Sequence, residues 1–190
     1  MLIQFNKPYG VVCQFSPSGD KPTLKNFIDI PGVYPAGRLD TDSEGLLLLT
    51  DDGSLQAAIA DPRHKLPKTY WVEVEGIANE RALSPLRNGI DLGDFVTRPA
   101  TARIIPTPQS LWKREPPVRF RRQIPTSWLE ITIAEGKNRQ VRRMTAKVGL
   151  PTLRLIRVAI GGWALGDLAP GAWRELETAA TNLPGARKGS

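Results

Sequence analysis

The sequence predicts a protein of the α+β class, with a mixed, largely antiparallel sheet and short flanking helices. Three observations support this prediction. Short segments with strand character recur along the 190 residues, and 41% of the residues are hydrophobic, enough to form a buried core. Short helical segments lie between these strands. The two kinds of element do not alternate regularly, as they would in a doubly wound parallel sheet.

The first third of the chain combines short strands with short helical segments. Residues 2–5 and 11–15 have strand character on either side of the turn NKPYG, and residues 23–28 form a short helical stretch. Residues 45–50, GLLLLT, are a short apolar run typical of a buried strand. The turn signature Asp51-Asp52-Gly53 ends that strand, and a helix follows over residues 54–60.

The rest of the chain continues the same pattern. The segment KTYWVEVE, residues 68–75, alternates with period two, so Tyr70, Val72 and Val74 share one face of a strand. Asn79 is a suitable N-cap for a helix that ends near residue 88. Turns and strands follow over residues 89–105, with further strands at 128–133, 153–160 and 173–176 and a helix at 137–148.

These elements suggest one catalytic domain, residues 1–178, made of two lobes at about 1–65 and 66–178. Residues 106–125 contain five prolines and read as a basic loop or arm. Residues 179–190 read as a flexible tail. The cations of the arm, which we expect to contact a polyanion, are Lys113, Arg114, Arg119, Arg121 and Arg122. The alternative is a disordered insertion without a role.

The charge balance favours a nucleic-acid partner. Lys and Arg number 26 against 19 Asp and Glu, which gives a net charge of +7 and a pI near 9.9. Such a balance suits a polyanion, although an ordinary basic surface is the alternative. No apolar run approaches the roughly 18 residues that a membrane span requires.

The scarce residue types exclude several kinds of site. Cys13 is the only cysteine, so no intrachain disulfide can form, and a reducing, cytoplasmic location is expected. His64 is the only histidine, which leaves no Cys/His zinc cluster and a single candidate for a Ser-His-Asp triad. Glycine-rich phosphate loops are absent. An enzyme with this composition would use carboxylates, lysines, arginines and tyrosines, without a metal or a cofactor.

The segment PAGRLDTDSEGLLLLTDDG, residues 35–53, contains the first candidate for chemistry. Arg38 and Asp40 precede the apolar run, and alternation along an extended segment places them on one side. A carboxylate held rigidly beside a strand is a candidate nucleophile or general base. The alternative is a turn or capping residue, the role expected of the acids Asp42, Glu44, Asp51 and Asp52.

Two further segments contain candidate residues. Tyr70 is either a core residue or a ring that stacks on a nucleic-acid base. In EGKNRQVRRM, residues 135–144, cations meet the positive end of a helix dipole, so a phosphate or a protein carboxylate should lie nearby. Arg142 and Arg143 of this helix are candidates for RNA contact, with a solvated basic face as the alternative.

Four motifs together resemble a known family. NKPYGVVCQFS, GRLDTDSEGLLLLTDDG, KTYWVEVEG and EGKNRQVRRM occur in this order at suitable spacings. They are similar to motifs of the RNA pseudouridine synthases over residues 2 to about 177, most closely the branch typified by the ribosomal small-subunit synthase A. Many members of that branch carry an N-terminal S4 domain. This chain starts at the catalytic domain, which points to a subgroup that modifies the large ribosomal subunit.

The resemblance implies a fold and an activity. It implies the pseudouridine synthase fold with a central cleft, and a monomeric isomerase that converts a uridine of ribosomal RNA, specifically 23S RNA, to pseudouridine without a cofactor. Two alternatives remain open: a non-catalytic RNA-binding or ribosome-assembly protein on the same scaffold, and a synthase that acts on transfer RNA.

The resemblance also implies roles for individual residues. Asp40 corresponds to the catalytic aspartate and Tyr70 to the tyrosine that stacks on the target uracil. Lys137 is expected to pair with Asp40, with Arg139 as the alternative. Two further residues have implied roles: Arg38 fills the space of the flipped base, and Leu155 packs under the tyrosine.

Overall fold

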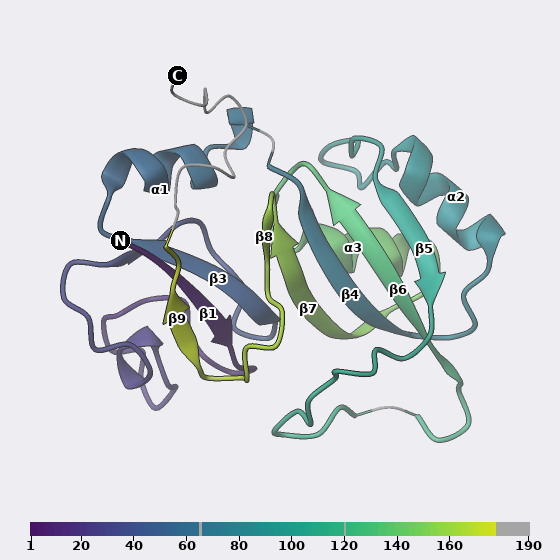
Figure 1. The fold of residues 1–190 in the computed structure, drawn as a ribbon. Helices are drawn as coiled ribbons and strands as arrows, with labels where there is room; N and C mark the ends of the chain where they lie inside the picture. The colour runs from purple at the N-terminus through teal and green to yellow at the C-terminus, as the bar shows by residue number, and fades with distance from the viewer. Residues whose placement is uncertain (65, 120, 178–190) are drawn as a thin grey trace. The chain divides into compact units, whose positions relative to one another are not determined.

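The computed structural model in Figure 1 describes residues 1–64, 66–119 and 121–177. The chain forms two compact units. Of the described residues, unit 1 contains those within Met1–Leu66 together with residues 157–177, and unit 2 contains those within Pro67–Ile156. The sequence predicts that residues 157–177 belong to the second lobe, but they return to unit 1 because strand β9 (Trp173–Glu175) pairs with strand β1 (Leu2–Lys7). The predicted tail, residues 179–190, lies outside the described residues.

Unit 1 is built around two strands buried on both faces. β1 pairs antiparallel with β3 (Glu44–Thr50), with Ile3 opposite Leu49 and Lys7 opposite Gly45. Every residue of both strands is buried. Within this unit the strand order is β7-β3-β1-β9, where β7 spans Thr152–Ile160, and β2 (Tyr34–Pro35) and β8 (Trp163–Ala164) are short additions.

Short helical segments flank these strands. The 3-10 turn Leu24–Asn26 packs Leu24 into the core formed by Ile3, Phe5, Leu47 and Leu49. Helix α1 (Gly53–Ala60) follows β3, and its N-cap is Asp52, whose side chain accepts hydrogen bonds from two backbone amides. A second 3-10 turn, Pro62–His64, follows α1.

The predicted strand at residues 11–15 is not formed. Val12 makes an isolated bridge to Thr23, with a backbone bond from Val12 N to Pro22 O. Pro22 has no N–H to return, and the chain enters the 3-10 turn directly after Thr23. The segment therefore cannot extend this bridge into a ladder.

Unit 2 is an antiparallel sheet with two helices on one face. Its strand order is β5-β6-β4-β7, where β4 is Lys68–Glu75, β5 is Thr101–Ile105 and β6 is Thr126–Ile133. The predicted alternation of β4 is present, and its buried residues pack with helix α2 (Glu80–Asn88) and helix α3 (Gln140–Lys147). Figure 1 shows both helices beside this sheet. The α+β class predicted from the sequence is confirmed.

Helix α3 is shorter than the sequence predicts. It begins at Gln140 instead of residue 137, because its N-cap, Arg139, has a left-handed backbone with φ 50°. A non-glycine residue in this conformation interrupts the right-handed helix. The segment before Arg139 is therefore a loop.

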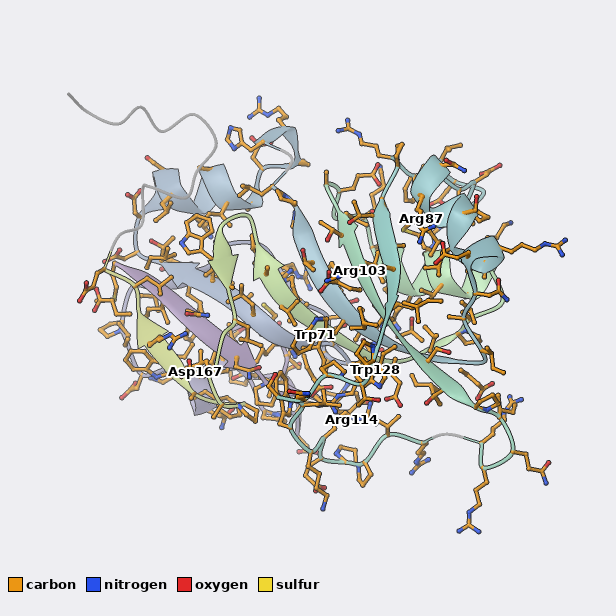
Figure 2. The ribbon with its side chains drawn as sticks, turned by 45° about the vertical axis from the view of Figure 1, so that its right-hand side comes forward. Trp71, Arg87, Arg103, Arg114, Trp128 and Asp167 are labelled. Carbon is orange, nitrogen blue, oxygen red and sulfur yellow. The ribbon has the colours of Figure 1, made fainter. Side chains whose placement is uncertain are left out.

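The arm at residues 106–125 forms no helix or strand over its described residues, 106–119 and 121–125 (Figure 1). Arg114 anchors it through three carbonyl groups. Its Nε donates to Pro116 O at 2.8 Å, and its two Nη atoms donate to Pro117 O at 3.0 Å and to Leu153 O at 3.5 Å. Figure 2 shows Arg114 beside the strands of unit 2, which agrees with its bond to β7.

Gly45 allows a close approach of two strands within unit 1. Its φ is +101°, and a Cβ at this position would lie 2.3 Å from the carbonyl oxygen of Arg157. The atoms that it would meet belong to backbone, so the clash cannot be relieved by moving a side chain. The residue must therefore be glycine for β3 to pack against β7.

We expect Gly45→Ala to lower the free energy of unfolding by more than about 3 kcal/mol, because overpacking and a strained φ each cost roughly 1–3 kcal/mol. Gly32→Ala is the matched control. Gly32 also has a positive φ, +80°, but nothing lies within 4 Å of its added Cβ. Urea unfolding of both variants measures the difference, and equal losses would contradict the close-approach argument.

Candidate active site

The residues that the sequence suggests for chemistry lie in both units. Arg38 and Asp40 belong to unit 1, and Tyr70, Lys137, Arg139 and Leu155 belong to unit 2. Each group has a defined environment within its own unit. The pairing of Asp40 with Lys137 or Arg139 stays a prediction, as does the expected cleft.

Asp40 follows a buried anchor residue. Leu39 is 6% exposed and packs in the core of unit 1, whereas Arg38 is exposed and Asp40 is half-buried. The carbonyl of Asp40 accepts a hydrogen bond from Ser43 N at 3.1 Å, which closes a turn directly after it. The side chain of Leu39 and this turn together fix the backbone of the acid.

Two buried cations bind carbonyl groups of this same segment, residues 38–46. Arg157, which is 4% exposed, donates from Nε to Leu46 O at 2.8 Å and from Nη1 to Arg38 O at 3.2 Å. Lys7, which is 0% exposed, directs Nζ to Val11 O at 2.9 Å and to Thr41 O at 3.5 Å. The backbone around Asp40 is thus tied to the interior.

Neither Lys7 nor Arg157 is among the site residues predicted from the sequence. The sequence does contain a sign that Lys7 is unusual. It is the only charged residue of the segment LIQFNK, which is a strand whose residues are all buried. A charged residue at the end of such a strand is rarely buried without partners. Arg157 is harder to recognise from the sequence. Its strand contains a second arginine, Arg154, and the sequence does not tell which of the two binds the segment at residues 38–46.

Burial changes the acid–base behaviour of Lys7. Removal of its ammonium group from water lowers its pKa from 10.5 to about 8, against the raising effect of Cys13 and Glu44. Its neighbours within hydrogen-bond distance include the neutral carbonyls of Pro8 and Val11. Near neutral pH the cost of desolvating this cation is therefore only partly compensated by its surroundings.

Tyr70 and Leu155 share one environment in unit 2. They are 7% and 5% exposed and belong to the same hydrophobic cluster, and Tyr70 is paired with Ile131 of β6. The tyrosine ring is a core residue of this unit. Its stacking on a base stays a prediction, because stacking requires access to a face of the ring.

Lys137 and Arg143 both contact Phe95. The Nζ atom of Lys137 lies 4.7 Å from the centre of the Phe95 ring, and the guanidinium carbon of Arg143 lies 5.5 Å from it. Such cation–π contacts stabilise a positive charge without neutralising it. Arg143 also pairs with Asp94 and bonds Leu92 O, so much of its donor capacity is used within the protein.

The sequence predicts that either a phosphate or a protein carboxylate lies beside the N-terminus of α3, and the structure has a carboxylate there. Glu135 accepts a hydrogen bond from Nε2 of Gln140, the first residue of the helix, at 2.5 Å. The Oε1 atom of Gln140 in turn accepts from Lys137 N at 3.2 Å. The negative charge of Glu135 thus offsets the helix dipole among the neighbouring cations.

The cations of the arm differ in exposure. Lys113, Arg119, Arg121 and Arg122 are exposed, and Arg114 is half-buried. The pairs Lys113–Glu115 at 3.4 Å and Arg121–Glu75 at 3.8 Å join solvent-facing cations to carboxylates. Both partners of the Lys113–Glu115 pair are exposed, so this pair contributes little stability and its lysine can exchange the carboxylate for another anion.

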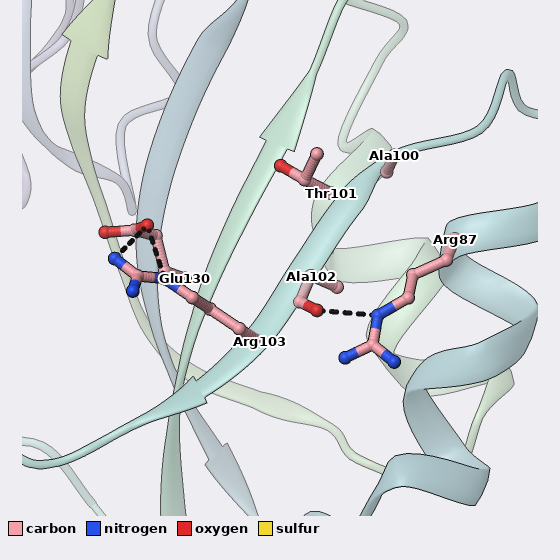
Figure 3. Close-up of a pocket in the computed structure, with 6 residues that line it drawn as sticks. All are labelled: Arg87, Ala100, Thr101, Ala102, Arg103 and Glu130. Atoms are coloured by element: carbon pink, nitrogen blue, oxygen red, sulfur yellow. Dashed lines mark hydrogen bonds and ion pairs between the residues drawn. The ribbon is translucent and has the colours of Figure 1, made fainter.

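A pocket of about 420 Å³ in unit 2 contains none of the sequence-predicted site residues. Figure 3 shows its lining along β5 and α2. Arg87 donates to Ala102 O at 2.8 Å, and Arg103 pairs with Glu130 at 2.7 Å. The charged groups of the lining thus bond within the protein, and we assign this pocket no function.

None of the helices in residues 1–64, 66–119 and 121–177 is long and apolar enough to cross a bilayer.

Comparison with known proteins identifies the relatives of the chain. The family model described as RNA pseudouridylate synthase matches residues 1–147. Ribosomal large subunit pseudouridine synthase E of Xanthomonas campestris is 59% identical over 176 residues, which cover 92% of this chain and 94% of the relative. Ribosomal small subunit pseudouridine synthase A of Escherichia coli is 37% identical, over 90% of this chain and 68% of the relative.

A solved structure has a similar fold. A crystal structure described as pseudouridylate synthase superposes with a TM-score of 0.77 at 33% sequence identity, and the match covers 92% of this chain and 69% of that chain. The family resemblance predicted from the four motifs is therefore confirmed.

The buried Lys7 generates a test of the environment around residues 38–46. Between pH 8 and 10.5 the unfolded chain keeps a proton on Lys7 that the folded protein has lost, so folding stability rises with pH. We expect wild type to gain up to about 3 kcal/mol relative to Lys7→Met across this range, at 1.36 kcal/mol per unit of pKa. Urea unfolding at several pH values measures this gain.

Lys21→Met is the control, because Lys21 is an exposed lysine of the same unit. Its unfolding free energy should follow that of wild type at every pH. A Lys7→Met curve parallel to wild type would show that Lys7 is not desolvated.

Proposed function

Because the chain belongs to the RNA pseudouridylate synthase family, we propose that it converts a uridine of large-subunit ribosomal RNA, 23S RNA, to pseudouridine. The relatives with 58% and 59% identity are named ribosomal large subunit pseudouridine synthase E, which supports this substrate class. The proposal includes a monomer that acts in the cytoplasm without a cofactor.

The reaction is an isomerisation that conserves every atom of the substrate. The bond between N1 of uracil and C1′ of ribose breaks, the base rotates, and C5 forms a new bond to C1′. The proton leaves C5, and N1 of the product carries a proton. Neither a redox partner nor a group donor is consumed, so carboxylate and proton-transfer chemistry suffices.

In this proposal Asp40 is the catalytic carboxylate. It either attacks C1′, as the nucleophile of a retaining glycosidase does, or removes the proton from C2′ to give a glycal. Both routes require a carboxylate in a fixed place beside the sugar. The observation that supports the role best is the attachment of residues 38–46 to the buried Arg157 and Lys7 on both sides of Asp40.

The remaining candidates handle the base and the RNA backbone. The target nucleotide leaves its stack at a cost of a few kcal/mol, and base–aromatic stacking of roughly 1–3 kcal/mol offsets that cost. We assign the stacking ring to Tyr70, the packing beneath it to Leu155, and the gap left in the RNA to Arg38. Lys137 pairs with Asp40, and Arg139 is the alternative partner. Arg142 and Arg143 contact phosphates of the RNA.

The direct test is modification of unmodified RNA by the purified protein. Large-subunit RNA, small-subunit RNA and transfer RNA are incubated separately, and pseudouridine is mapped by carbodiimide modification and primer extension. We expect one or a few stops in the large-subunit RNA. Modification of transfer RNA alone would change the substrate class, and binding without modification of any RNA would indicate a non-catalytic protein.

We expect Asp40→Asn to reduce the single-turnover rate by at least about 1,000-fold, since removal of a catalytic group costs factors of this order. The amide is nearly isosteric, so the fold and the RNA affinity should be retained. Single-turnover assays at saturating RNA and filter binding measure the two quantities.

Asp52→Asn is the matched control. Asn caps a helix about as well as Asp, so α1 should be preserved and the rate should stay within twofold of wild type. Retention of a tenth of the wild-type rate in Asp40→Asn would remove Asp40 from the proposed role.

The arm generates a second prediction about RNA binding. Replacing Arg119, Arg121 and Arg122 with Gln should weaken binding to all RNA sequences, because phosphate contacts orient RNA without reading its bases. Each lost contact should reduce the slope of log affinity against log salt by about 0.7 for a single strand and 0.9 for a duplex. The single-turnover rate at saturating RNA should hardly change.

Binding titrations at several salt concentrations measure these slopes. Lys21→Gln, which removes one exposed cation of unit 1, shows how much the slope changes when a single charge is lost outside the arm. Parallel lines for wild type and the triple variant would mean that the arm does not touch the RNA backbone.

A further inference from the structure

Within the part of the chain that the structure describes, the hydrogen bonds of the buried Arg157 go to backbone carbonyls and not to a carboxylate. The described residues offer its guanidinium two acceptors, the carbonyl oxygens of Leu46 at 2.8 Å and of Arg38 at 3.2 Å. The side chain is 4% exposed, and its Nη2 atom is buried without a hydrogen-bond partner in that part of the chain. Burying an arginine in this way is costly, which calls for an explanation beyond packing.

The two acceptors lie at the two ends of one segment. Arg38 precedes Asp40 by two residues, and Leu46 follows it by six, within β3. A planar guanidinium offers several N–H donors in a rigid fork, so it can hold two carbonyls at a fixed separation. The guanidinium of Arg157 therefore links the first residue of the segment, Arg38, to Leu46 in strand β3.

The backbone of Arg157 is itself fixed against this segment. A Cβ on Gly45 would lie 2.3 Å from the carbonyl oxygen and 2.9 Å from the nitrogen of Arg157, which shows how closely β7 approaches β3. The side chain of Arg157 thus starts from a backbone that cannot shift away. Lys7 assists at the middle of the segment with its longer contact of 3.5 Å to Thr41 O.

We propose that Arg157 is a positioning residue that sets the place of Asp40 by joining the carbonyls of Arg38 and Leu46. This inference rests on the proposed function, because it assigns the fixed segment a purpose in catalysis. Arg157 acts through the backbone and does not touch the reacting atoms. A lysine at this position retains the charge but presents one nitrogen instead of the fork.

The decisive variant is therefore Arg157→Lys. We expect its single-turnover rate at saturating RNA to fall at least tenfold, since a misplacement of about 1 Å can cost on the order of 100-fold in rate. Its RNA affinity should stay within twofold of wild type. Amide hydrogen exchange should become at least fivefold faster in peptides that cover residues 38–46, and it should change little elsewhere in unit 1.

Ile59→Ala is the control for a loss of stability without loss of the fork. Ile59 is 2% exposed and lies in α1, which follows the far end of β3. This variant should lower the melting temperature, keep the rate within twofold of wild type, and leave exchange in residues 38–46 at the level of the rest of the unit. All rates are measured below the melting temperatures of both variants.

The outcomes separate the inference from the proposed function. A wild-type protein that modifies no RNA overturns the proposed function, and the exchange experiment then decides the role of Arg157 alone. An active wild type with an Arg157→Lys rate within twofold overturns the positioning role, as does exchange that rises evenly through unit 1. If Arg157→Lys does not fold, Arg157→Gln replaces it, and failure of both variants to fold would make Arg157 purely structural.

Discussion

The antiparallel ladder between β1 and β3 is the constraint on which unit 1 depends. Both strands are buried on both faces, and a slip of one residue would exchange the two faces of β1 and place Gln4 and Asn6 in the apolar core. This register places Lys7 opposite Gly45 at the end of the ladder. Gly45 then admits the backbone of β7, and the segment that carries Asp40 enters β3 at this junction. Rigidity at Asp40 is thus a consequence of packing in strands that contain no catalytic group.

Most elements of this fold can be predicted from short sequence patterns, because interactions between residues close in sequence determine them. The alternation in residues 68–75 and the caps of α1 and α2 depend on neighbouring residues, and each was readable from the sequence. The start of α3 could not be predicted in this way, because Arg139 adopts a positive φ, which arginine does not favour. The return of residues 157–177 to unit 1 depends on the pairing of β9 with β1, a contact between the two ends of the chain.

The same distinction applies to the candidate site. Asp40 could be singled out because its motif is continuous in sequence, and the chain belongs to the family that the four motifs together suggested. The cations that hold its segment could not, since Arg157 meets Arg38 across 119 positions of sequence. Tyr70 shows a further limit: alternation predicts its burial correctly but does not tell a core ring from a ring that stacks on a base.

The hydrogen-bond partners of the buried Arg157 and Lys7 affect the electrostatic field around Asp40. An ion pair with a carboxylate would cancel most of the field of Arg157 and Lys7, whereas the bonds that hold residues 38–46 go to neutral carbonyls. Carbonyl dipoles solvate a cation but leave its net charge in place. The field of these two cations, which the buried Glu44 offsets in part, favours anionic groups along this segment. A sequence that places Asp40, Asp42 and Glu44 on this one segment is consistent with that field, and the same field would stabilise negative charge held beside the sugar of a bound nucleotide.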